Sequence, residues 1–396
     1  MAENKLSRRQ TLAALAAIGM GAALPARIAH ATTAGARNFI FINLRGAADG
    51  LALVMPTGDP DLRRHRAQLV DAAGEGGTRL DAMFTLHPAL AAIGRNYVGG
   101  QAIIAHAVAS SYRDRSHFDA QNILETGGIA AYAEQSGWMN RLISLVGQDE
   151  RHALAFAATV PPVLRGPQPV ASFAPSALPA AQDDLLARVS AMYAGDPELH
   201  ALYETALATR AMAGDDAEGR LRNGGVMGTM VARLMTPGSV DSQGDGQSAH
   251  IVSIDLEGWD THNGQPGRIA ARLRELDALV AALEVGLGEE WTRTTVLIAT
   301  EFGRTVATNG TSGTDHGTAS AAILLGGSVS GGRVLADWPG LSSSALYEGR
   351  DLRPTMAMEA LISGVVSEHY GVDPSRTAST LYPAHMGLRP ITGLIA

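Results

Sequence analysis

The feature that most constrains this 396-residue chain is its alternation of short apolar runs with longer segments of helical spacing. The apolar runs have the length and composition of buried strands, and they are residues 39–44, 102–108, 154–158, 250–256, 295–299 and 319–325. The helical segments lie between or after them, at residues 88–96, 120–125, 138–146, 183–213, 219–235, 268–287 and 356–370. Alternating strands and helices predict an α/β fold, with a mostly parallel central sheet that is flanked by helices on both faces.

We expect residues 32–396 to form a single α/β domain. Their number exceeds the ~100–200 residues of a typical domain, yet one large α/β domain with insertions accommodates it. Residues 160–179 are rich in Pro, Ser and Ala and are expected to be irregular, with a β-hairpin as the alternative. The segment 183–235 is a candidate helical insertion.

The first 31 residues are typical of a targeting signal rather than of a folded domain. Arg8 and Arg9 form a twin-arginine pattern, a weakly apolar Ala/Gly-rich run follows, and Ala29-His30-Ala31 resembles a cleavage site. The apolar run is shorter than the ~20 residues of a membrane span, and no later segment qualifies. A disordered leader is the alternative. We expect a Tat signal peptide that engages the Tat translocon, and a periplasmic or extracellular mature protein.

Charge and cysteine content narrow the classes of function. The chain carries a formal net charge of −8. Residues 1–31 contribute +3, so that the remainder carries −11 (−8 minus +3). An acidic protein without basic runs is a poor partner for nucleic acid or an anionic membrane. The absence of cysteine excludes disulfides and thiolate ligands, so any metal must be held by His, Asp, Glu or hydroxyl groups.

Polar clusters follow several of the predicted strands. The first cluster includes Arg45 and Asp49 among glycines, and Asp49 can either bind a metal or cap a helix after an ordinary turn. The second includes Arg115, Ser116 and His117 just before a predicted helix. Ser116 fits a helix N-cap, but the same position suits a reactive hydroxyl, because unpaired N–H groups at a helix start stabilise negative charge.

A third cluster, residues 255–265, contains three carboxylates and one imidazole. Asp260 and His262 are separated by one residue on a predicted loop, a spacing that lets both side chains reach one ion. This spacing is a weak signal when it stands alone. The acidic residues at the end of the preceding strand strengthen the prediction of a metal site.

The fourth cluster begins where the apolar run 295–299 ends. Glu301 and Arg304 follow this run, and Asp315-His316 leads into the next one. A helix cap, a salt bridge and a hydrogen-bonded loop pair are the respective structural alternatives. However, open α/β sheets bind ligands at the carboxyl ends of their strands. Four such clusters therefore favour one shared metal or catalytic site.

These clusters, in this order, resemble a Tat-exported family known as domain of unknown function 1501, which is grouped with the alkaline phosphatase and sulfatase superfamily. The resemblance covers nearly all of the mature chain. Its landmarks are residues 44–51, 116–121, 258–262, 300–305, 313–317 and 337–341. They are specific for the family and much less specific for an activity. The resemblance implies an alkaline-phosphatase-like fold with two adjacent divalent metal ions, commonly zinc or manganese.

The resemblance also implies candidate ligands. One metal of the superfamily typically takes an Asp and two His, and Asp260, His262 and His316 match that set by position, although members usually space the first pair more widely. The second metal usually takes an early Asp, the nucleophile and a consecutive Asp-His pair. Asp49 comes later than expected, and the pair reads Glu301-Phe302. A ligand is therefore missing unless His117 replaces it, and the site is expected to hold one or two ions.

Ser116 is the expected nucleophile of such a site, with Ser111 as the alternative, and Arg304 or Arg115 would steady the anion. A formylglycine sulfatase mechanism is excluded because the chain contains no C-x-P-x-R motif. We therefore expect a metal-dependent hydrolase that acts on a small anionic phosphoric or sulfuric ester. A single-metal, water-activated hydrolase is a close variant. The alternative is a non-catalytic periplasmic binding or assembly protein on a degenerate scaffold, which the Phe302 position favours.

Overall fold

Residues 36–147, 150–175, 183–193, 195–213, 223–236 and 248–396 are described by the computed structural model. The expected signal peptide lies outside these residues. The central sheet has the strand order β10-β4-β9-β8-β1-β7-β5-β6, and β11 pairs with β4. The strands are β1 (Asn38–Leu44), β4 (Ala102–Ala109), β5 (Ala153–Phe156), β6 (Ala171–Ser172), β7 (Ile251–Leu256), β8 (Thr294–Ala299), β9 (Ser320–Leu325), β10 (Arg333–Leu335) and β11 (Met356–Ala357). Every predicted strand is present, which confirms the mostly parallel α/β class.

Strand β9 is the exception to the parallel arrangement among the described strands of this sheet. It runs antiparallel to both of its neighbours, β4 and β8, whereas β1 pairs parallel with β7 and β8. An antiparallel strand begins at the edge where its parallel neighbours end. The residues just before β9 therefore lie at the same edge of the sheet as the residues that follow β8, β1 and β7.

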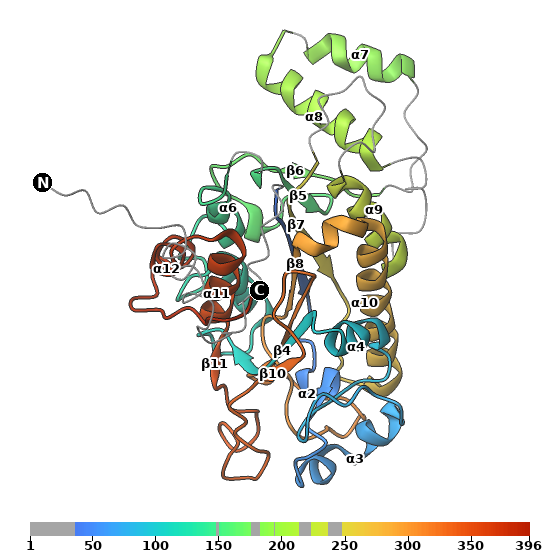
Figure 1. The fold of residues 1–396 in the computed structure, drawn as a ribbon, viewed down its shortest axis with the longest axis vertical. Coiled ribbons are helices and arrows are strands. Elements are labelled where there is room, and N and C mark those ends of the chain that lie inside the picture. The colour runs from blue at the N-terminus through green and yellow to red at the C-terminus, as the bar shows by residue number, and fades with distance from the viewer. Residues whose placement is uncertain (1–35, 148–149, 176–182, 194, 214–222, 237–247) are drawn as a thin grey trace, which may run out of the picture. The chain divides into compact units, whose positions relative to one another are not determined.

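Helices cover both faces of the sheet (Figure 1). Alternate side chains of β1 point to opposite faces: Ile40 and Ile42 belong to one core cluster, and Phe39 and Phe41 belong to another. The first cluster contains residues of α4 (Ala91–Val98), α9 (Gly224–Met235) and α10 (Gln265–Leu287), and the second contains residues of α6 (Trp138–Ile143), α11 (Met358–Tyr370) and α12 (Pro374–Leu381). The helix α5 (His117–Thr126) follows β4 and begins beside the candidate site.

Some short elements were not predicted. They are α2 (Gly50–Leu53), α3 (Leu62–Ala73), α12, β10, β11 and a two-stranded sheet of β2 (Val54–Met55) and β3 (Thr85–Leu86). Residues 183–213 form two helices, α7 (Asp183–Tyr193) and α8 (Pro197–Ala213), whereas α9 packs in the main core. In the irregular segment after β5, the described residues form a 3-10 turn (Pro162–Leu164) and β6, which pairs parallel with β5, so they do not form the alternative hairpin. No helix of the described residues is long and apolar enough to cross a membrane.

The fold requires glycine where the loop after β8 meets the loop before β9. Gly303 donates its N–H to the Thr318 carbonyl and accepts from the Gly317 N–H, and a Cβ at Gly303 would collide with the backbone of Ala319. We expect Gly303→Ala to destabilise the protein by about 2 kcal/mol, because overpacking forces backbone shifts. The control Gly310→Ala places its Cβ in open space. Equal unfolding midpoints in urea for these two variants would contradict the prediction.

Candidate metal centre

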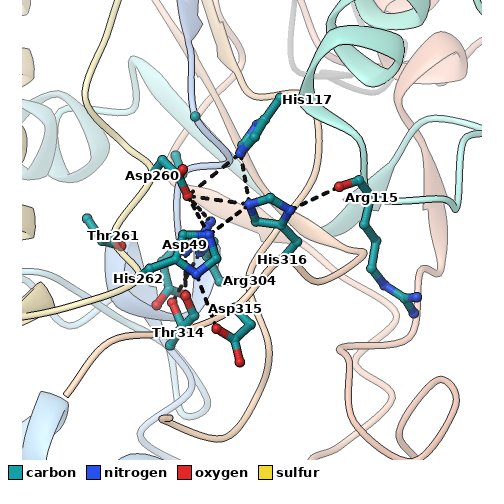
Figure 2. A network of polar contacts seen from close by, with 12 residues as sticks. Asp49, Arg115, His117, Asp260, Thr261, His262, Arg304, Thr314, Asp315 and His316 are labelled. Atoms are coloured by element: carbon teal, nitrogen blue, oxygen red, sulfur yellow. Dashed lines mark hydrogen bonds and ion pairs between the residues drawn. The ribbon is translucent and has the colours of Figure 1, made fainter. Parts of the chain in front are cut away.

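Three segments far apart in the sequence bring histidines to one point at the edge of the sheet (Figure 2). His117 is the first residue of α5, which follows β4. His262 lies on the loop after β7, together with Asp260, and His316 lies shortly before β9. The antiparallel direction of β9 is what places His316 beside the other residues, as the sequence analysis required of a shared site.

The donor atoms of these residues converge closely. His316 Nε2 lies 2.9 Å from His117 Nε2 and 2.9 Å from His262 Nε2. Asp260 Oδ1 lies 3.1 Å from Nε2 of His262, 3.5 Å from that of His316 and 3.7 Å from that of His117. His117, Asp260 and His316 form a group that could hold a metal ion, since their ligand atoms all lie within 4.8 Å of one another.

Each histidine has an oxygen acceptor at its other ring nitrogen. His316 Nδ1 lies 3.0 Å from the Arg115 carbonyl, His117 Nδ1 lies 2.8 Å from Glu301 Oε1, and His262 Nδ1 lies 3.1 Å from Asp315 Oδ1. Because a carbonyl or carboxylate oxygen only accepts, each Nδ1 carries a hydrogen. In the neutral ring, Nε2 then holds a lone pair. Each of the three Nε2 atoms lies within 3.7 Å of Asp260 Oδ1, and metal-binding histidines have outer oxygen partners of this kind.

The surroundings lower the pKa of His316 and of Asp260 and raise the pKa of His117. Burial, together with the neighbouring charge of His117, lowers the pKa of His316. Burial also acts to lower the pKa of His117, but the hydrogen bond and charge of Glu301 outweigh it, and the pKa is raised. Burial acts to raise the pKa of Asp260, and the hydrogen bond and charge of Arg304 reverse this effect. A cation that bound here would therefore compete with a proton on His117.

Glu301 and Phe302 both contact the His117 ring and fix its orientation. Glu301 is buried, and Oε1 also accepts from the Gly46 N–H (2.9 Å) and Gln121 Nε2 (3.1 Å). The Phe302 ring stacks on His117 with centroids 5.0 Å apart. These contacts hold the carboxylate and the imidazole in one orientation. The structure thus places Glu301, a predicted ligand, as the hydrogen-bond partner of a ligand candidate.

Both arginines that were predicted to bind an anion have guanidinium groups that are already paired with carboxylates. Arg304 is buried; its Nη1 donates to Asp260 Oδ1 (2.7 Å). The Arg115 guanidinium pairs with Asp351 and Glu348. Figure 2 shows that the Arg115 side chain points away from His316 and that only its carbonyl oxygen points toward it. In this geometry, Arg304 fixes Asp260 and the Arg115 backbone fixes His316.

Asp49 does not join the donors. It is buried, caps α2 through the Leu51 N–H (3.1 Å), and accepts from Arg66 Nη1 with both carboxylate oxygens at 3.1 and 3.0 Å. Gln265 Nε2 donates to the same carboxylate at 2.5 Å. With these partners, the carboxylate acts in a buried ion pair, which agrees with the capping alternative of the sequence analysis.

The candidate nucleophiles lie near the start of α5. Ser116 is half-buried and occupies the N-cap position, but its hydroxyl makes no capping hydrogen bond, and its N–H donates to Tyr112 Oη at 3.3 Å. Ser111 is exposed, and its N–H donates to Glu359. Ser116 directly precedes His117 in the chain. Ser116 therefore lies nearer than Ser111 to a converging histidine along the chain.

A pocket of about 490 Å³ opens beside the converging donors. His117 and Asp260 form one part of its wall, and the exposed Arg165 forms another. The Nε of Arg165 donates to the Val160 carbonyl (3.1 Å). The pocket gives a small molecule access to the donor atoms and places a guanidinium within it.

Arg45 lines this pocket and pairs with two carboxylates, of which Asp255 also lines it. It pairs with Glu125 (2.6 Å) and with Asp255 (2.9 Å). Burial raises the pKa of Glu125 to about 7 and also raises the pKa of Asp255, despite the opposing charge of Arg45. One guanidinium cannot fully compensate two buried carboxylates, so the pair retains a proton near neutral pH.

Comparison of the sequence with known families identifies one match. The family model of DUF1501, a protein family of unknown function, matches residues 107–364. The chain belongs to this family. No curated protein matches its sequence significantly. The expected resemblance to DUF1501 is therefore confirmed, and the family assignment carries no activity with it.

Solved structures with similar folds are distant from this DUF1501 chain. Ps i-CgsB in complex with k-i-k-neocarrahexaose is 8% identical, with a TM-score of 0.38, over 90% of this chain and 77% of that chain. A phosphonate monoester hydrolase from Silicibacter pomeroyi is 11% identical, with a TM-score of 0.33, over 86% and 74%. That of Agrobacterium radiobacter is 11% identical, with a TM-score of 0.27, over 76% and 70%. Similarity of this degree carries no argument about activity.

Several residues of the site were not singled out from the sequence. Gln121 and Glu125 lie one and two turns after His117 on α5, and Thr261, Gln265 and Thr314 lie beside predicted ligands. The spacing of four and eight residues from His117 was a signal for the first two, because it places them on the same helix face. Gln265 and the threonines had no comparable signal, since their roles depend on contacts between distant segments.

The buried Glu125 predicts how stability depends on pH. Its folded-state pKa of about 7 exceeds the ordinary value of 4.5, so the folded protein binds the proton more tightly than the unfolded chain. Stability is then greatest below about pH 4.5 for this group and decreases as pH rises toward 7. We expect a loss of roughly 3 kcal/mol at most, and a flatter profile in Glu125→Gln. Urea unfolding between pH 5 and 8 measures this, with Glu75→Gln at an exposed site as the control. A wild-type slope in Glu125→Gln would contradict it.

Proposed function

We propose that this DUF1501 protein is a metal-dependent hydrolase of a phosphoric or related ester. The observation that carries the proposal is the convergence of three Nε2 lone pairs and one carboxylate oxygen, each imidazole being fixed by an oxygen acceptor. Without a cation, these electron-rich atoms repel one another at 2.9–3.7 Å. A divalent ion removes this repulsion and makes the arrangement favourable.

The donor set fits one ion of zinc or manganese type. Zinc lies ~2.0–2.1 Å from nitrogen and oxygen ligands, so two ligands of a tetrahedral site lie about 3.3 Å apart. His117, Asp260 and His316 would hold the ion, and His262 offers a fourth donor. Among the described residues, this is the only His/Asp/Glu group with suitable separations. Asp49 and Glu301 are engaged elsewhere, so we propose a single ion rather than two.

The pocket supports an anionic ester as the substrate. A bound divalent ion would polarise the ester and stabilise the negative charge that develops on its oxygens. Arg165 lines the same pocket and can donate to a phosphate or sulfate oxygen. The first turn of α5 directs N–H groups and the positive end of its dipole toward an anion beside His117. These features orient a small phosphate or related ester with its anionic group toward His117.

Ser116 is the nucleophile of this proposal. Its hydroxyl makes no capping bond and precedes His117 at the start of α5. Attack of the Ser116 oxygen on phosphorus would form an O–P bond as the bond to the ester's alcohol oxygen breaks, and the alcohol would leave with the proton that serine loses. Water would then cleave the phosphoserine, which releases phosphate and restores the hydroxyl. Water as the direct nucleophile is the variant, because His117 lines the pocket whereas Ser116 does not.

The leader supports export. Residues 1–31 have the twin-arginine pattern of a Tat signal, so we propose that the mature protein acts in the periplasm or outside the cell. Tat substrates cross the membrane folded, which is compatible with a metal that is bound before export.

The metal centre predicts the metal content of defined variants. We expect about one equivalent of a divalent ion in wild-type protein purified without chelators. We expect His316→Ala to lose it, because His316 Nε2 contacts both other imidazoles. His385→Ala removes a half-buried histidine elsewhere and should retain the ion. Elemental analysis measures all three proteins. Equal metal content in His316→Ala and His385→Ala would overturn the site, and no metal in wild type after reconstitution would overturn the proposed function.

The nucleophile is tested with aryl phosphates and sulfates. We expect metal-loaded protein to hydrolyse 4-nitrophenyl phosphate, bis-4-nitrophenyl phosphate or 4-nitrophenyl sulfate. Ser116→Ala should reduce kcat by a factor on the order of 10³ or more while metal content is unchanged, because loss of a nucleophile removes the covalent route. Ser111→Ala, at the alternative nucleophile, is measured beside it and should keep full activity. Full activity in both variants would assign the attack to water, whereas loss of activity in Ser111→Ala alone would assign it to Ser111.

A non-catalytic binding protein is the second candidate. It is favoured by Phe302, which stacks on His117 at the position where the superfamily pattern has a ligand. Metal binding without hydrolysis of any of the three esters would support it, whereas hydrolysis that depends on His316 would exclude it.

A further inference from the structure

A connected set of buried polar side chains lies next to the proposed metal centre. The set comprises Asp49, Arg66, Thr261, Gln265, Arg304 and Thr314, and is called here the buried network. All six residues are at most 1% exposed. None of them is a proposed ligand of the single ion. Figure 2 shows Asp49, Thr261, Arg304 and Thr314 in the same group of contacts as Asp260 and His262.

Gln265 connects the two loops that carry the ligands. Its Oε1 accepts from Thr261 Oγ1 (3.1 Å) and from Thr314 Oγ1 (2.6 Å). Thr261 stands between Asp260 and His262, and Thr314 stands two residues before His316. The Thr314 N–H also donates to the Thr261 carbonyl at 3.2 Å. One amide oxygen therefore holds the loop after β7 against the loop before β9.

The same amide is anchored on its other side. Gln265 Nε2 donates to Asp49, and Asp49 is paired with Arg66. Arg66 also donates to the carbonyls of Thr305 (2.8 Å) and Val306 (2.9 Å), directly after Arg304. The network thus returns to the segment that carries Arg304. Because every member is buried and bonded, it opposes rotation of any one part.

Arg304 connects the buried network to the proposed ligand Asp260. Its Nε donates to Thr314 Oγ1 (3.2 Å), its Nη2 donates to the Thr314 carbonyl, and its Nη1 donates to Asp260. Its backbone pairs with His316 in an isolated antiparallel bridge. The Asp260 side chain is 45% exposed, so packing alone does not fix its orientation, and the hydrogen bond from the buried Arg304 helps to define it.

We infer that Gln265 is a positioning residue of the metal centre, which it serves by locking the two ligand loops and, through Thr314 and Arg304, the Asp260 carboxylate. This inference rests on the proposed metal centre. Gln265 is suited to the role because an amide both donates to Asp49 and accepts from two hydroxyls, whereas a carboxylate or an aliphatic side chain offers only part of this.

The experiment compares Gln265→Leu with Asn140→Leu. Asn140 is a fully buried amide whose Nδ2 also joins segments, through the Leu164 (2.9 Å) and Gln168 (3.0 Å) carbonyls, but it lies outside the network. Zinc affinity is measured by chelator competition, and the Tm of each metal-free protein is measured in parallel. We expect both variants to lose Tm. Only Gln265→Leu should weaken zinc binding, by roughly tenfold or more. Equal zinc affinity in the two variants would overturn the inference.

Moving the negative charge from Asp49 to residue 265 distinguishes an effect on ligand positioning from an effect on folding. Gln265→Glu places two carboxylates together, and Asp49→Asn in the same chain restores a donor and an acceptor at that contact with the net charge unchanged. We expect Gln265→Glu to bind zinc more weakly than wild type and the double variant to recover affinity. A double variant no better than Gln265→Glu would contradict the role.

A third measurement needs no metal. If wild type binds no zinc, the proposed function fails, and Gln265 is then assessed by the imidazole ¹⁵N signals of His262 and His316 in metal-free protein. We expect Gln265→Leu to shift or broaden both signals and Asn140→Leu to leave them unchanged. Unaltered signals in Gln265→Leu would overturn the positioning role independently of any activity.

Discussion

The antiparallel direction of β9 is the constraint on which the candidate site depends. A parallel β9 would begin at the opposite edge of the sheet, and His316 would lie a full strand length from Asp260 and His117. The reversal instead joins the loops before β9 and after β8 closely enough that Gly303 can carry no side chain. The candidate metal centre, the Arg304–His316 bridge and the buried network all form at this junction.

The fold could be predicted to a large extent because its core signals are local. Buried strands such as β1 and β8 are continuous apolar runs, and neither requires knowledge of its partner. Residue types at the strand ends likewise indicated a His/Asp site, and His117, Asp260, His262 and His316 do meet. The direction of β9 could not be read from its composition, since an apolar run is compatible with either orientation. Short elements such as β10 and β11 were missed because a strand of two or three residues is too short to show a periodic pattern.

The roles of individual acids were harder to predict for a physical reason. A carboxylate after a strand can bind a metal, pair with an arginine or accept from an imidazole, and the choice depends on what long-range packing places beside it. Asp49 meets Arg66, only 17 residues away, and also Gln265, 216 residues away. Glu301 meets His117 across 184 residues. None of these three partners can be identified from the sequence next to the acid. Asp260 differs because its loop leaves its carboxylate partly exposed beside three imidazoles.

Phe302 connects these observations. A histidine at this position would add a fifth possible metal ligand beside His117, Asp260, His262 and His316. Phenylalanine supplies only a flat apolar face. That face stacks on His117, and Glu301 next to it accepts from the same ring, so the two residues together restrict both the tilt and the rotation of the imidazole. Under the proposed function, the Glu301-Phe302 pair offers no ligand to a second ion and instead supports His117, a proposed ligand of the first. The position that weakened a two-metal prediction is, by this geometry, an argument for one well-ordered ion.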